Sequence, residues 1–592
     1  MAELRSAGAQ SRGSDAGGSG GKELVKRLSA AIVIIALAVG IGLRVVGLAN
    51  VPPALSQDEA CEGYDAYSVL LTGRDHHGNF LPLAMQGFDD YRMPLFQYSL
   101  VPLVAAFGLK PAVVRLGAAL WGSVDLVALT ALAGLMMGWP GAAAAALFGA
   151  LSPWHLTFSR HGQEFTVASA TITLGMLCFF LWLRRRRDLW LMTSAAFFGL
   201  SLYSYATTKA FLPLLLALLI VLYRSELKTV RLKVLAGAAA ILMCLALPQV
   251  VLLMLHPIEM QAEFQHLSLF RIIATCQGCQ PGETAPAGHA FSNQLIGFGA
   301  SWLSYFTPSF LFIVGDRGDH WTMIHPPGFG QLLPEQAPLI LLALGAMLSA
   351  PRRRIALLLA GWLIVAALPA ALTIPLGVSY PEASALPTPH VMFNYAVLPT
   401  PPTPSLLLAH PDSRHDALAM VPWILFSALG FVLLLEWTSR WPVVSASAAG
   451  LIFVSTIFHG AQFARYYFSD FPTVAAPYLQ YGIEQALGAV DKLDDGHEPI
   501  VITARINQPY IYVLFFEHYP PADFQLGPVR RASGLFGQVF AFGRYVFAKP
   551  HSVYPWITHG IFVYAGQDNL PKAADFTIRY PDGTVAYNIV VK

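Results

Sequence analysis

Residues 30–48 read AAIVIIALAVGIGLRVVGL, an apolar run with a single charge at Arg44. As a helix rising about 1.5 Å per residue, the run is about as long as the hydrocarbon core of a bilayer is thick, roughly 30 Å. No small-residue cleavage site follows it, which predicts a membrane span that the protein retains. Residues 1–28 are rich in Gly, Ser and Ala and offer nothing to bury, so they are predicted to form a disordered cytosolic tail.

Apolar runs of similar kind continue through most of the chain. They lie at residues 112–136, 140–156, 165–183, 189–206, 209–223, 234–255, 336–350, 355–372, 418–437 and 442–459. The predicted fold class is therefore an α-helical polytopic membrane protein with about eleven spans. Of the 592 residues, 55% are hydrophobic and 12% are charged, which excludes a soluble globular enzyme. The net charge of +2 creates no bulk field that would attract nucleic acid.

The positions of the basic residues predict the topology. Clusters at residues 184–187, 224–233 and 352–354, together with Arg440, all fall in cytosolic loops if the N-terminus is cytosolic. The same assignment sends residues 51–111, the short turn around 157–164, residues 256–335, residues 373–417 and the tail beyond 460 to the opposite side, here called the outer face.

The tail has the pattern of a small α/β domain. Residues 481–493 have helical character, and residues 500–503 and 544–548 resemble strands. Residues 576–580 and 584–591 flank Pro581-Asp582-Gly583 as in a hairpin. The predicted organisation is a tail at 1–28, a membrane domain at 29–460 and an outer domain at 461–592.

The first outer loop is the densest gathering of charged side chains near the predicted membrane boundary. Between Gln57 and Tyr98 it carries Asp58, Glu59, Glu62, Asp65, Arg74, Asp75, His76, His77, Asp89, Asp90 and Arg92. Most of these fit an ordinary solvated loop. Asp58 and Glu59 differ because they follow the first span within about ten residues and lie close to the bilayer surface. A carboxylate held there can accept a proton from a hydroxyl group.

Sequence motifs in this loop and in later segments are similar to those of a known family. The matching words are Asp58-Glu59, Gly63-Tyr64-Asp65-Ala66, Thr72-Gly73-Arg74-Asp75, Asp90-Tyr91-Arg92-Met93-Pro94-Leu95 with Tyr98, Ser152-Pro153-Trp154-His155, Phe158-Ser159-Arg160, and Gly315-Asp316 with His320. The chain resembles bacterial members of the PMT-like glycosyltransferases, glycosyltransferase family 39. That family includes protein O-mannosyltransferases and the aminoarabinose transferases of lipid A.

The resemblance implies a GT-C fold, in which a helical membrane bundle and its outer loops face a lipid-linked sugar donor. It implies that Asp58 is the catalytic base, with Glu59 and Glu164 as further catalytic candidates. Arg92 stands where relatives commonly place a lysine that meets the donor phosphate. Arg160 and Arg44 are further candidates for that phosphate, although Arg44 also fits a side chain that snorkels to the interface.

Further residues border the implied cavity as second-tier candidates: Tyr91, Tyr98, Asp316, His320 and Arg414. No metal or cofactor is required, and a divalent cation on Asp58 and Glu59 stays an open alternative. Cys276 and Cys279 have the spacing of half a zinc ribbon but no second pair, which favours a disulfide or two free thiols.

The function implied is transfer, with inversion, of a sugar from a polyprenyl-phosphate donor to a hydroxyl of a protein, lipid or glycan acceptor. The location implied is the plasma (inner) membrane, surrounded by membrane lipids, with the active site and the C-terminal domain outside the cytoplasm. A secondary transporter or lipid flippase is the alternative, but the acidic residues crowd the outer loops rather than the spans. A structural scaffold would leave the charged first loop unexplained.

Overall fold

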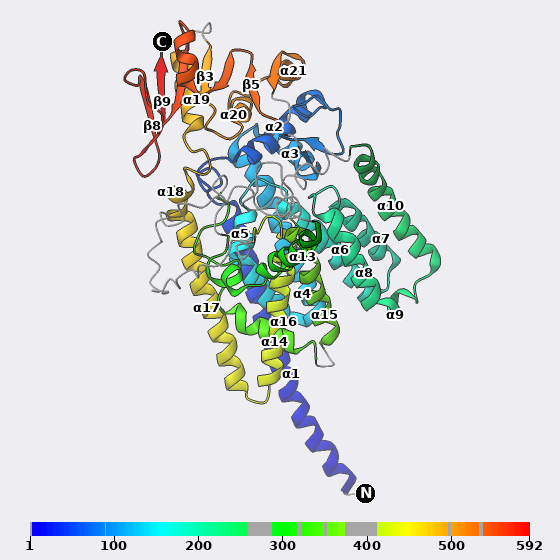
Figure 1. The fold of residues 1–592 in the computed structure, drawn as a ribbon. Helices are drawn as coiled ribbons and strands as arrows, with labels where there is room; N and C mark the ends of the chain where they lie inside the picture. Colours follow the sequence, from blue (N-terminus) through cyan, green and yellow to red (C-terminus); the bar gives the residue numbers. More distant parts are fainter. Residues whose placement is uncertain are drawn as a thin grey trace.

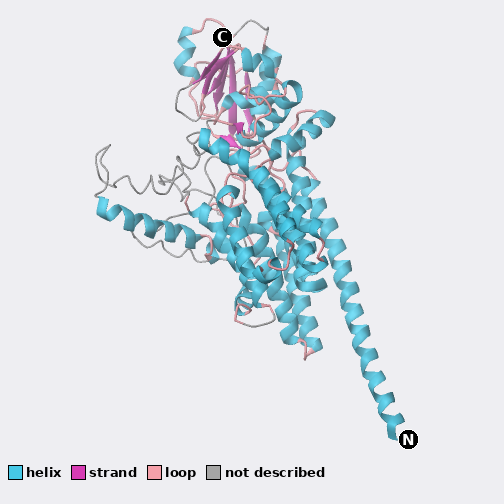
Figure 2. Ribbon diagram, turned by 90° about the vertical axis from the view of Figure 1, so that its right-hand side faces the viewer, coloured by secondary structure: helices cyan, strands magenta, loops and turns pink. Residues whose placement is uncertain are grey.

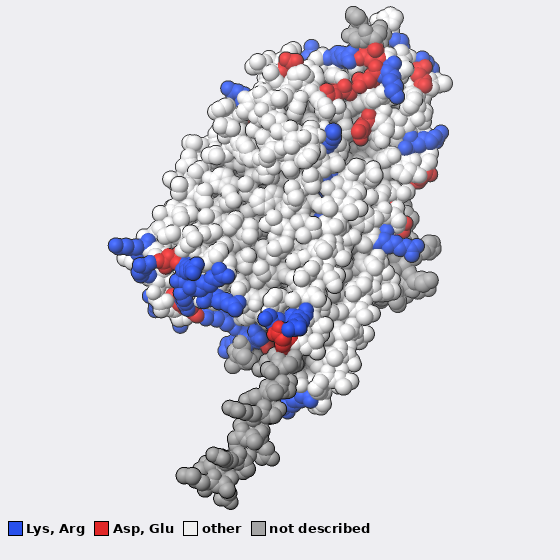
Figure 3. All heavy atoms as spheres, turned by 180° about the vertical axis from the view of Figure 1, so that it is seen from behind, with Lys and Arg blue, Asp and Glu red and all other residues white. Residues whose placement is uncertain are grey.

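The computed structural model describes residues 3–88, 90–256, 287–316, 323–348, 352–372, 411–494, 499–531 and 537–592. A bundle of helices forms most of the molecule, and a β-sheet domain sits on one end of it (Figure 1). The N-terminus lies at the opposite end from this domain. We call the end that carries the β-sheet domain the sheet end. The opposite end, where the N-terminus lies, is called the basic end because Lys and Arg side chains gather there (Figure 3).

Every apolar run predicted to span the membrane is helical over most of its length. The helices are α1 (Glu3–Val45), α4 (Pro111–Leu151), α6 (Phe165–Arg185), α7 (Asp188–Ser201), α8 (Thr208–Leu222), α10 (Leu232–Leu255), α14 (Gln336–Gly345), α15 (Arg353–Ala371), α16 (Met420–Thr438) and α17 (Pro442–Ser469). Among the described residues, eight helical segments have the length and apolar composition needed to cross a membrane. The prediction of a multi-pass helical membrane protein is therefore confirmed.

Helix α4 contains two of the predicted spans. Its backbone is not helical at Gly138, where φ is 81° and ψ is −170°, and Pro140 follows. A Cβ on Gly149 would lie 2.9 Å from the side chain of Leu126, so the two halves of α4 pack against each other. The element is a helical hairpin, because a glycine at positive φ and a proline break the helix at its tip.

Two features differ from the predicted spans. Helices α7 and α14 have 14 and 10 residues, shorter than the runs at 189–206 and 336–350 from which they were predicted. A further apolar segment of spanning length, residues 295–313, lies within the stretch predicted to form an outer loop. It consists of the end of α13 (Ala287–Ser304) and a π-helix, η2 (Ser309–Ile313).

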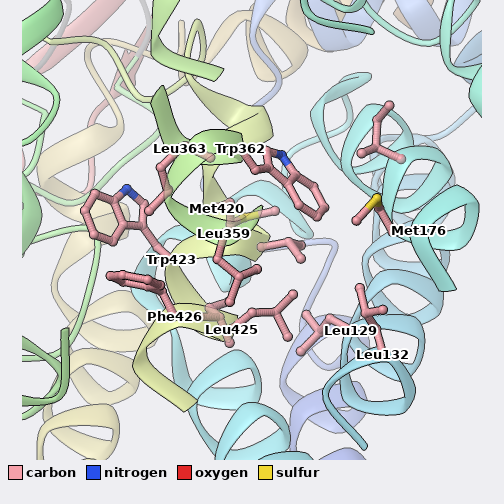
Figure 4. Close-up of a cluster of buried hydrophobic side chains, with 14 of the residues drawn as sticks. Leu129, Leu132, Met176, Leu359, Trp362, Leu363, Met420, Trp423, Leu425 and Phe426 are labelled. Atoms are coloured by element: carbon pink, nitrogen blue, oxygen red, sulfur yellow. The ribbon is translucent and has the colours of Figure 1, made fainter. Parts of the chain in front are cut away.

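The interior of the bundle is a single apolar cluster. Figure 4 shows side chains of α4, α6, α15 and α16 in contact there, including Trp362, Met420 and Phe426. The indole nitrogen of Trp362 donates to the carbonyl of Leu418 at 3.1 Å, which satisfies its one polar group inside the core. Helices α14 and α16 approach so closely that a Cβ on Gly430 would overlap the backbone of α14.

Charged side chains are distributed as expected for a protein that crosses a membrane. In the view of Figure 3, Lys and Arg gather at the basic end, near the N-terminus. A broad surface with few charges separates them from Lys, Arg, Asp and Glu side chains at the sheet end.

The sheet end begins with the first predicted outer loop. This loop folds into α2 (Gln57–Thr72), a two-stranded ladder of β1 (Met85–Gln86) and β2 (Tyr91–Arg92), and α3 (Leu95–Phe107). The two strands are antiparallel, with Met85 opposite Arg92.

The C-terminal domain has a seven-stranded mixed sheet in the order β4-β5-β6-β3-β7-β9-β8, visible in side view in Figure 2. The strands are β3 (Ile500–Thr503), β4 (Val529–Arg531), β5 (Val539–Phe542), β6 (Tyr545–Ala548), β7 (Ile561–Ala565), β8 (Phe576–Arg579) and β9 (Val585–Val591). Strands β3 and β6 pair in parallel, and β8 and β9 form the predicted hairpin. Helices α18 (Phe471–Ala475), α19 (Ile483–Leu493), α20 (Pro509–Phe516), α21 (Pro521–Leu526) and α22 (Pro550–Val553) complete the domain.

This domain packs directly on the first loop. Side chains of α2, α3, α19 and α20 share one buried apolar cluster with the sheet. The hydroxyl of Tyr64 donates to the carbonyl of Tyr519 at 2.7 Å, and Tyr512 donates to the carbonyl of Leu55 at 3.3 Å. The C-terminal domain therefore covers and braces the loop that carries most of the candidate site.

Candidate active site

The first turn of α2 separates Asp58 from its neighbour Glu59. Ser56 caps the helix: its hydroxyl accepts from the backbone of Glu59, and the Glu59 carboxylate accepts from the backbone of Ser56 at 3.0 Å. Residues one apart on a helix point about 100° apart, whereas residues four apart share a face. Asp58 and Glu62 consequently lie on one face of α2, and Glu59 points elsewhere. The N-terminus of α2 favours negative charge at Asp58 and Glu59, which lie in its first turn.

Arg92 lies at the centre of a group of carboxyl side chains. Its Nη2 donates to Oδ1 of Asp58 at 2.7 Å, its Nη1 lies 3.7 Å from Oε1 of Glu62, and its Nε lies 3.5 Å from Oδ2 of Asp90. The guanidinium also stacks over the ring of Phe88, 5.0 Å from its centroid. Although burial opposes its charge, Asp58 and Asp90 hold the pKa of Arg92 above its ordinary value.

Among the carboxyl groups around Arg92, those of Asp90 and Asp58 are accessible, and Asp58 also contacts Gln163. Its second oxygen accepts from Nε2 of Gln163 at 3.0 Å, so Arg92 and Gln163 fix both oxygens of the carboxylate. Its side chain remains 22% exposed, whereas that of Glu62 is fully buried. A carboxylate that is oriented and still reachable has the geometry expected of a general base.

Glu62 and Glu164 form a pair of carboxyl groups beside Arg92. Glu164 precedes α6, and its carboxyl group faces that of Glu62. Burial, together with the charge of Glu164, raises the pKa of Glu62, and burial likewise raises the pKa of Glu164. Two carboxyl groups in such a place do not both ionise readily, so the pair is expected to retain a proton.

Glu59 is occupied by structural contacts. It is fully buried; its carboxylate accepts from Nε of Arg115 at 3.0 Å and from the backbone of Gly162 at 2.8 Å. His161 lies 3.8 Å away. Against the effect of burial, Arg115 and His161 lower the pKa of Glu59 to about 2. Glu59 therefore joins the start of α2 to α4 and to the turn before α6, and is not among the contacts of Arg92.

Arg160 and Arg44 also lie apart from Arg92. Arg160 donates to the carbonyls of Leu43, Val46 and Val51 at 2.7 to 2.8 Å. These hydrogen bonds satisfy backbone carbonyl groups at the C-terminal end of α1 and just after it. Arg44 donates to the carbonyls of Gly40 and Gly149 at 2.7 and 2.9 Å.

Arg44 is fully buried, so it does not snorkel to the interface. Its Nη2 lies 2.8 Å from Nδ1 of His155, whose other ring nitrogen lies 3.4 Å from Asp125 of α4. This buried network gives the charge polar partners inside the protein, which removes the need to reach the lipid headgroups.

The second-tier residues form separate groups. Asp316 accepts from Gln331 and from the backbone of Ser413, both at 3.0 Å, and burial with the charge of Asp412 raises its pKa to about 7. Arg414 forms an ion pair with Asp412, and its charge also acts on His161.

The two tyrosines flank Arg92 along the chain. The hydroxyl of Tyr98 donates to the carbonyl of Pro82 at 2.9 Å. The ring of Tyr91 lies 6.4 Å from that of His256. His320, Cys276 and Cys279 lie outside the described residues.

One group among the described residues has metal-ligand side chains at close spacing. Cys61, Asp65 and His76 are all buried, and their ligand atoms lie within 4.8 Å of one another. Oδ1 of Asp65 accepts from the backbone of His76 at 2.9 Å and lies 2.7 Å from its Nδ1, while the thiol of Cys61 lies 3.6 Å from Oδ2. Since each group already has a polar partner, the arrangement does not require an ion. Tyr510 of the C-terminal domain lies 3.3 Å from Nε2 of His76, which makes the group a contact between the two domains.

Sequence reasoning missed four participants: Glu62, Arg115, Gln163 and Asp125. Glu62 was visible as the residue four positions after Asp58 in a helix, and this spacing was the available signal. Arg115, Gln163 and Asp125 carry no such signal, because their partners are brought together only by the fold.

Comparison with solved structures shows that the chain has a known fold. No family model matches the chain, and no curated protein matches it. Among solved structures, ArnT from Cupriavidus metallidurans bound to undecaprenyl phosphate aligns with a TM-score of 0.53 at 12% identity, over 94% of this chain and 97% of the other. The apo state of the same protein aligns with a TM-score of 0.51 at 12% identity, over 95% and 98%. The Archaeoglobus fulgidus oligosaccharyltransferase tethered with an acceptor peptide aligns less well, with a TM-score of 0.48 at 13% identity, over 95% of this chain and 75% of the other.

The alignment with ArnT spans nearly the full length of both chains, including the C-terminal domain. The chain therefore shares the fold of the ArnT structure, a helical membrane bundle with a C-terminal mixed-sheet domain, and this agrees with the fold that the resemblance implied.

Proposed function

We propose that this protein is a membrane glycosyltransferase that moves a sugar from a polyprenyl-phosphate donor to an acceptor hydroxyl at the sheet end. The observation that carries the proposal is the contact between Asp58 and Arg92, which pairs a reachable carboxylate with a largely covered guanidinium near the N-terminus of α2. The likeness to a structure that holds undecaprenyl phosphate supports the same class of donor.

The chemistry assigns one role to each partner. Arg92 binds the donor phosphate through its planar fork, which suits phosphate oxygens. When the donor phosphate replaces Asp58 as the hydrogen-bond acceptor of Arg92, the Asp58 carboxylate is free to accept a proton. Gln163 keeps that carboxylate oriented through its hydrogen bond to Oδ2.

The transfer is then a single displacement. The acceptor oxygen bonds to the anomeric carbon on the face opposite the phosphate, its proton passes to Asp58, and the bond from the carbon to the phosphate oxygen breaks. The configuration at the anomeric carbon inverts. Arg92 stabilises the charge that develops on the departing phosphate, and such interactions are stronger where water is excluded.

Three of the predicted site residues hold α1 and α2 in place and do not contact Arg92: Glu59, Arg160 and Arg44. Glu59 anchors α2 through Arg115, while Arg160 and Arg44 hold the end of α1 through backbone carbonyls. We assign them to positioning α2 rather than to contact with the phosphate. The basic end is assigned to the cytoplasm and the sheet end to the extracytoplasmic side of the plasma membrane.

The test is a transfer assay with the purified full-length chain in detergent or nanodiscs. A polyprenyl-phosphate sugar is supplied with candidate protein, lipid and glycan acceptors, and release of polyprenyl phosphate is measured. Release that depends on acceptor and is lost in Asp58→Asn supports the proposal. Efficient transfer from a soluble nucleotide sugar without lipid carrier would overturn it. A transporter or flippase would leave the sugar-phosphate bond intact.

A further inference from the structure

The Glu62 carboxyl group sits in an environment that a lone carboxylate does not tolerate. It is fully buried, and neither of its oxygens accepts a hydrogen bond from an N–H or hydroxyl donor among the described residues. Its nearest cationic atom, Nη1 of Arg92, lies 3.7 Å away, beyond hydrogen-bonding distance. A buried polar group without a partner costs free energy, so it is expected to bind either a proton or a ligand.

Glu164 supplies the reason for a proton. Its carboxyl group faces Glu62 and approaches from the start of α6, while Arg92 approaches from β2. The other charged groups that act on Glu62 are Asp58 and Asp65, which lie on its own helix. One proton shared between Glu62 and Glu164 gives each carboxyl group a partner and avoids two adjacent charges of the same sign.

The position of the pair matters for the proposed donor. Arg92 offers Nη2 to Asp58, while Nη1 faces Glu62 across 3.7 Å. A phosphate that binds this guanidinium would therefore lie next to the Glu62 carboxyl group. Two anions at that distance would repel each other, but a protonated carboxyl group is a hydrogen-bond donor to phosphate.

We propose that Glu62 and Glu164 share one proton and present it, as a hydrogen bond, to the donor phosphate bound by Arg92. This inference rests on the proposed function and adds Glu62 as a phosphate-binding residue. The raised pKa of both groups, caused by burial, is consistent with it.

The proton count of the reaction is unchanged by this hydrogen bond. The acceptor hydroxyl loses its proton to Asp58, the bond from the anomeric carbon to the phosphate oxygen breaks, and the polyprenyl phosphate departs with that electron pair. The shared proton stays on the carboxyl pair and stabilises the charge on the leaving phosphate through the hydrogen bond. The pair thus supports the same charge as Arg92 from a second side.

The experiment compares two substitutions of Glu62 with different hydrogen-bonding ability. Glu62→Gln keeps a donor in the same shape, and its amide does not ionise, whereas Glu62→Leu keeps the volume approximately and removes the donor. Glu484→Gln is the matched control, because Glu484 is an exposed glutamate of α19 outside the site. Binding of undecaprenyl phosphate to the purified full-length chain is measured from about pH 6 to about pH 9, the range in which buried glutamates titrate.

The expected pattern has three parts. Wild-type protein and Glu484→Gln bind undecaprenyl phosphate more weakly as the pH rises, because the pair loses its proton. Glu62→Gln binds well and loses most of this pH dependence. Glu62→Leu binds about tenfold to a hundredfold more weakly at low pH, the effect of one hydrogen bond to a charged group.

Two results would overturn the inference alone. One is wild-type binding that neither variant changes in strength or in pH dependence. The other is equal loss in Glu62→Gln and Glu62→Leu with the wild-type pH dependence retained, which would assign Glu62 to folding or to an ionised role. If wild-type protein neither binds undecaprenyl phosphate nor releases it from a lipid-linked sugar, the proposed function itself fails, and the inference fails with it.

Discussion

At the scale of single residues, the candidate site is organised around the guanidinium of Arg92, which lies near three carboxyl groups. Arg92 contacts Asp58, Glu62 and Asp90, and no other cation lies as close to these carboxyl groups in the described part of the chain. The two residues named by the sequence as base and phosphate ligand are thus direct partners. In the proposed mechanism, their ion pair links donor binding to release of the base.

Asp58→Asn should reduce transfer by about 100-fold or more, because the amide keeps the shape of the side chain and cannot accept the proton. Release of polyprenyl phosphate under saturating donor measures the effect. The exposed Asp523, in α21 of the C-terminal domain, provides the control variant Asp523→Asn, which should keep wild-type turnover. Near-normal turnover in Asp58→Asn would move the base to another residue.

Arg92→Gln should weaken use of the lipid donor by about 1.5 to 3 kcal/mol for each charge-assisted hydrogen bond that the guanidinium makes to the phosphate. Arg92→Lys should recover part of this binding energy, since lysine supplies the charge without the planar fork. The donor dependence of the initial rate is the measurement. Arg74→Gln, which changes an exposed arginine of the same loop, is the control. A lipid-donor reaction that Arg92→Gln leaves intact would contradict the phosphate role.

At the scale of elements, the start of α2 is held by a buried ion pair. Glu59 accepts from Arg115 of α4 and from the backbone of Gly162. Arg115 also donates to the carbonyls of Pro52 and Ala54, which lie between α1 and α2. One arginine thereby connects three segments, and the orientation of Asp58 depends on it.

Glu59→Gln should destabilise the protein by about 3 to 5 kcal/mol near neutral pH, because it leaves the buried Arg115 without its carboxylate. The pKa of Glu59 is lowered from 4.5 to about 2, so its stabilising effect is present above about pH 4.5 and is lost as the pH falls through about 2. Thermal unfolding in detergent across this range should show the difference from wild type shrinking toward acid. A constant difference at all pH values would contradict the ion-pair account.

At the scale of the whole molecule, the two ends differ in charge and in structure. The basic residues gather near the N-terminus, and the C-terminal sheet packs on the first loop at the other end (Figures 1 and 3). The C-terminal domain therefore shares a side of the membrane with the site. The domain limits at residues 28 and 460 stay predictions; α1 begins at Glu3, and α17 extends to Ser469.

Cysteine labelling tests the orientation. In a variant without the native cysteines, Asp582→Cys, in the hairpin turn of the C-terminal domain, should react with a membrane-impermeant reagent added to intact cells. Arg186→Cys, in the loop between α6 and α7, should react only after the membrane is opened. The reverse result would place the site in the cytoplasm and would remove the argument for a lipid-linked donor on the outer side.

The sequence by itself determined the membrane bundle and the C-terminal α/β domain, and its resemblance to a known family singled out Asp58 and Arg92 as separate candidates. These properties follow from long apolar runs, from short runs rich in β-branched residues such as 500–503, and from motifs near the first span that resemble a known family. Such signals are local, and each element carries its own part of them.

Only the tertiary structure decided which charged residues meet. It separated Glu59 from Asp58 through the turn of one helix, turned Arg44 and Arg160 toward backbone carbonyls, and brought Glu62, Gln163 and Glu164 to the Arg92 group. Sequence spacing does not predict contacts between α2, β2 and the turn before α6, because those distances depend on how the helices pack. A buried charge takes whichever partner that packing brings to it, since leaving it unpaired costs several kcal/mol.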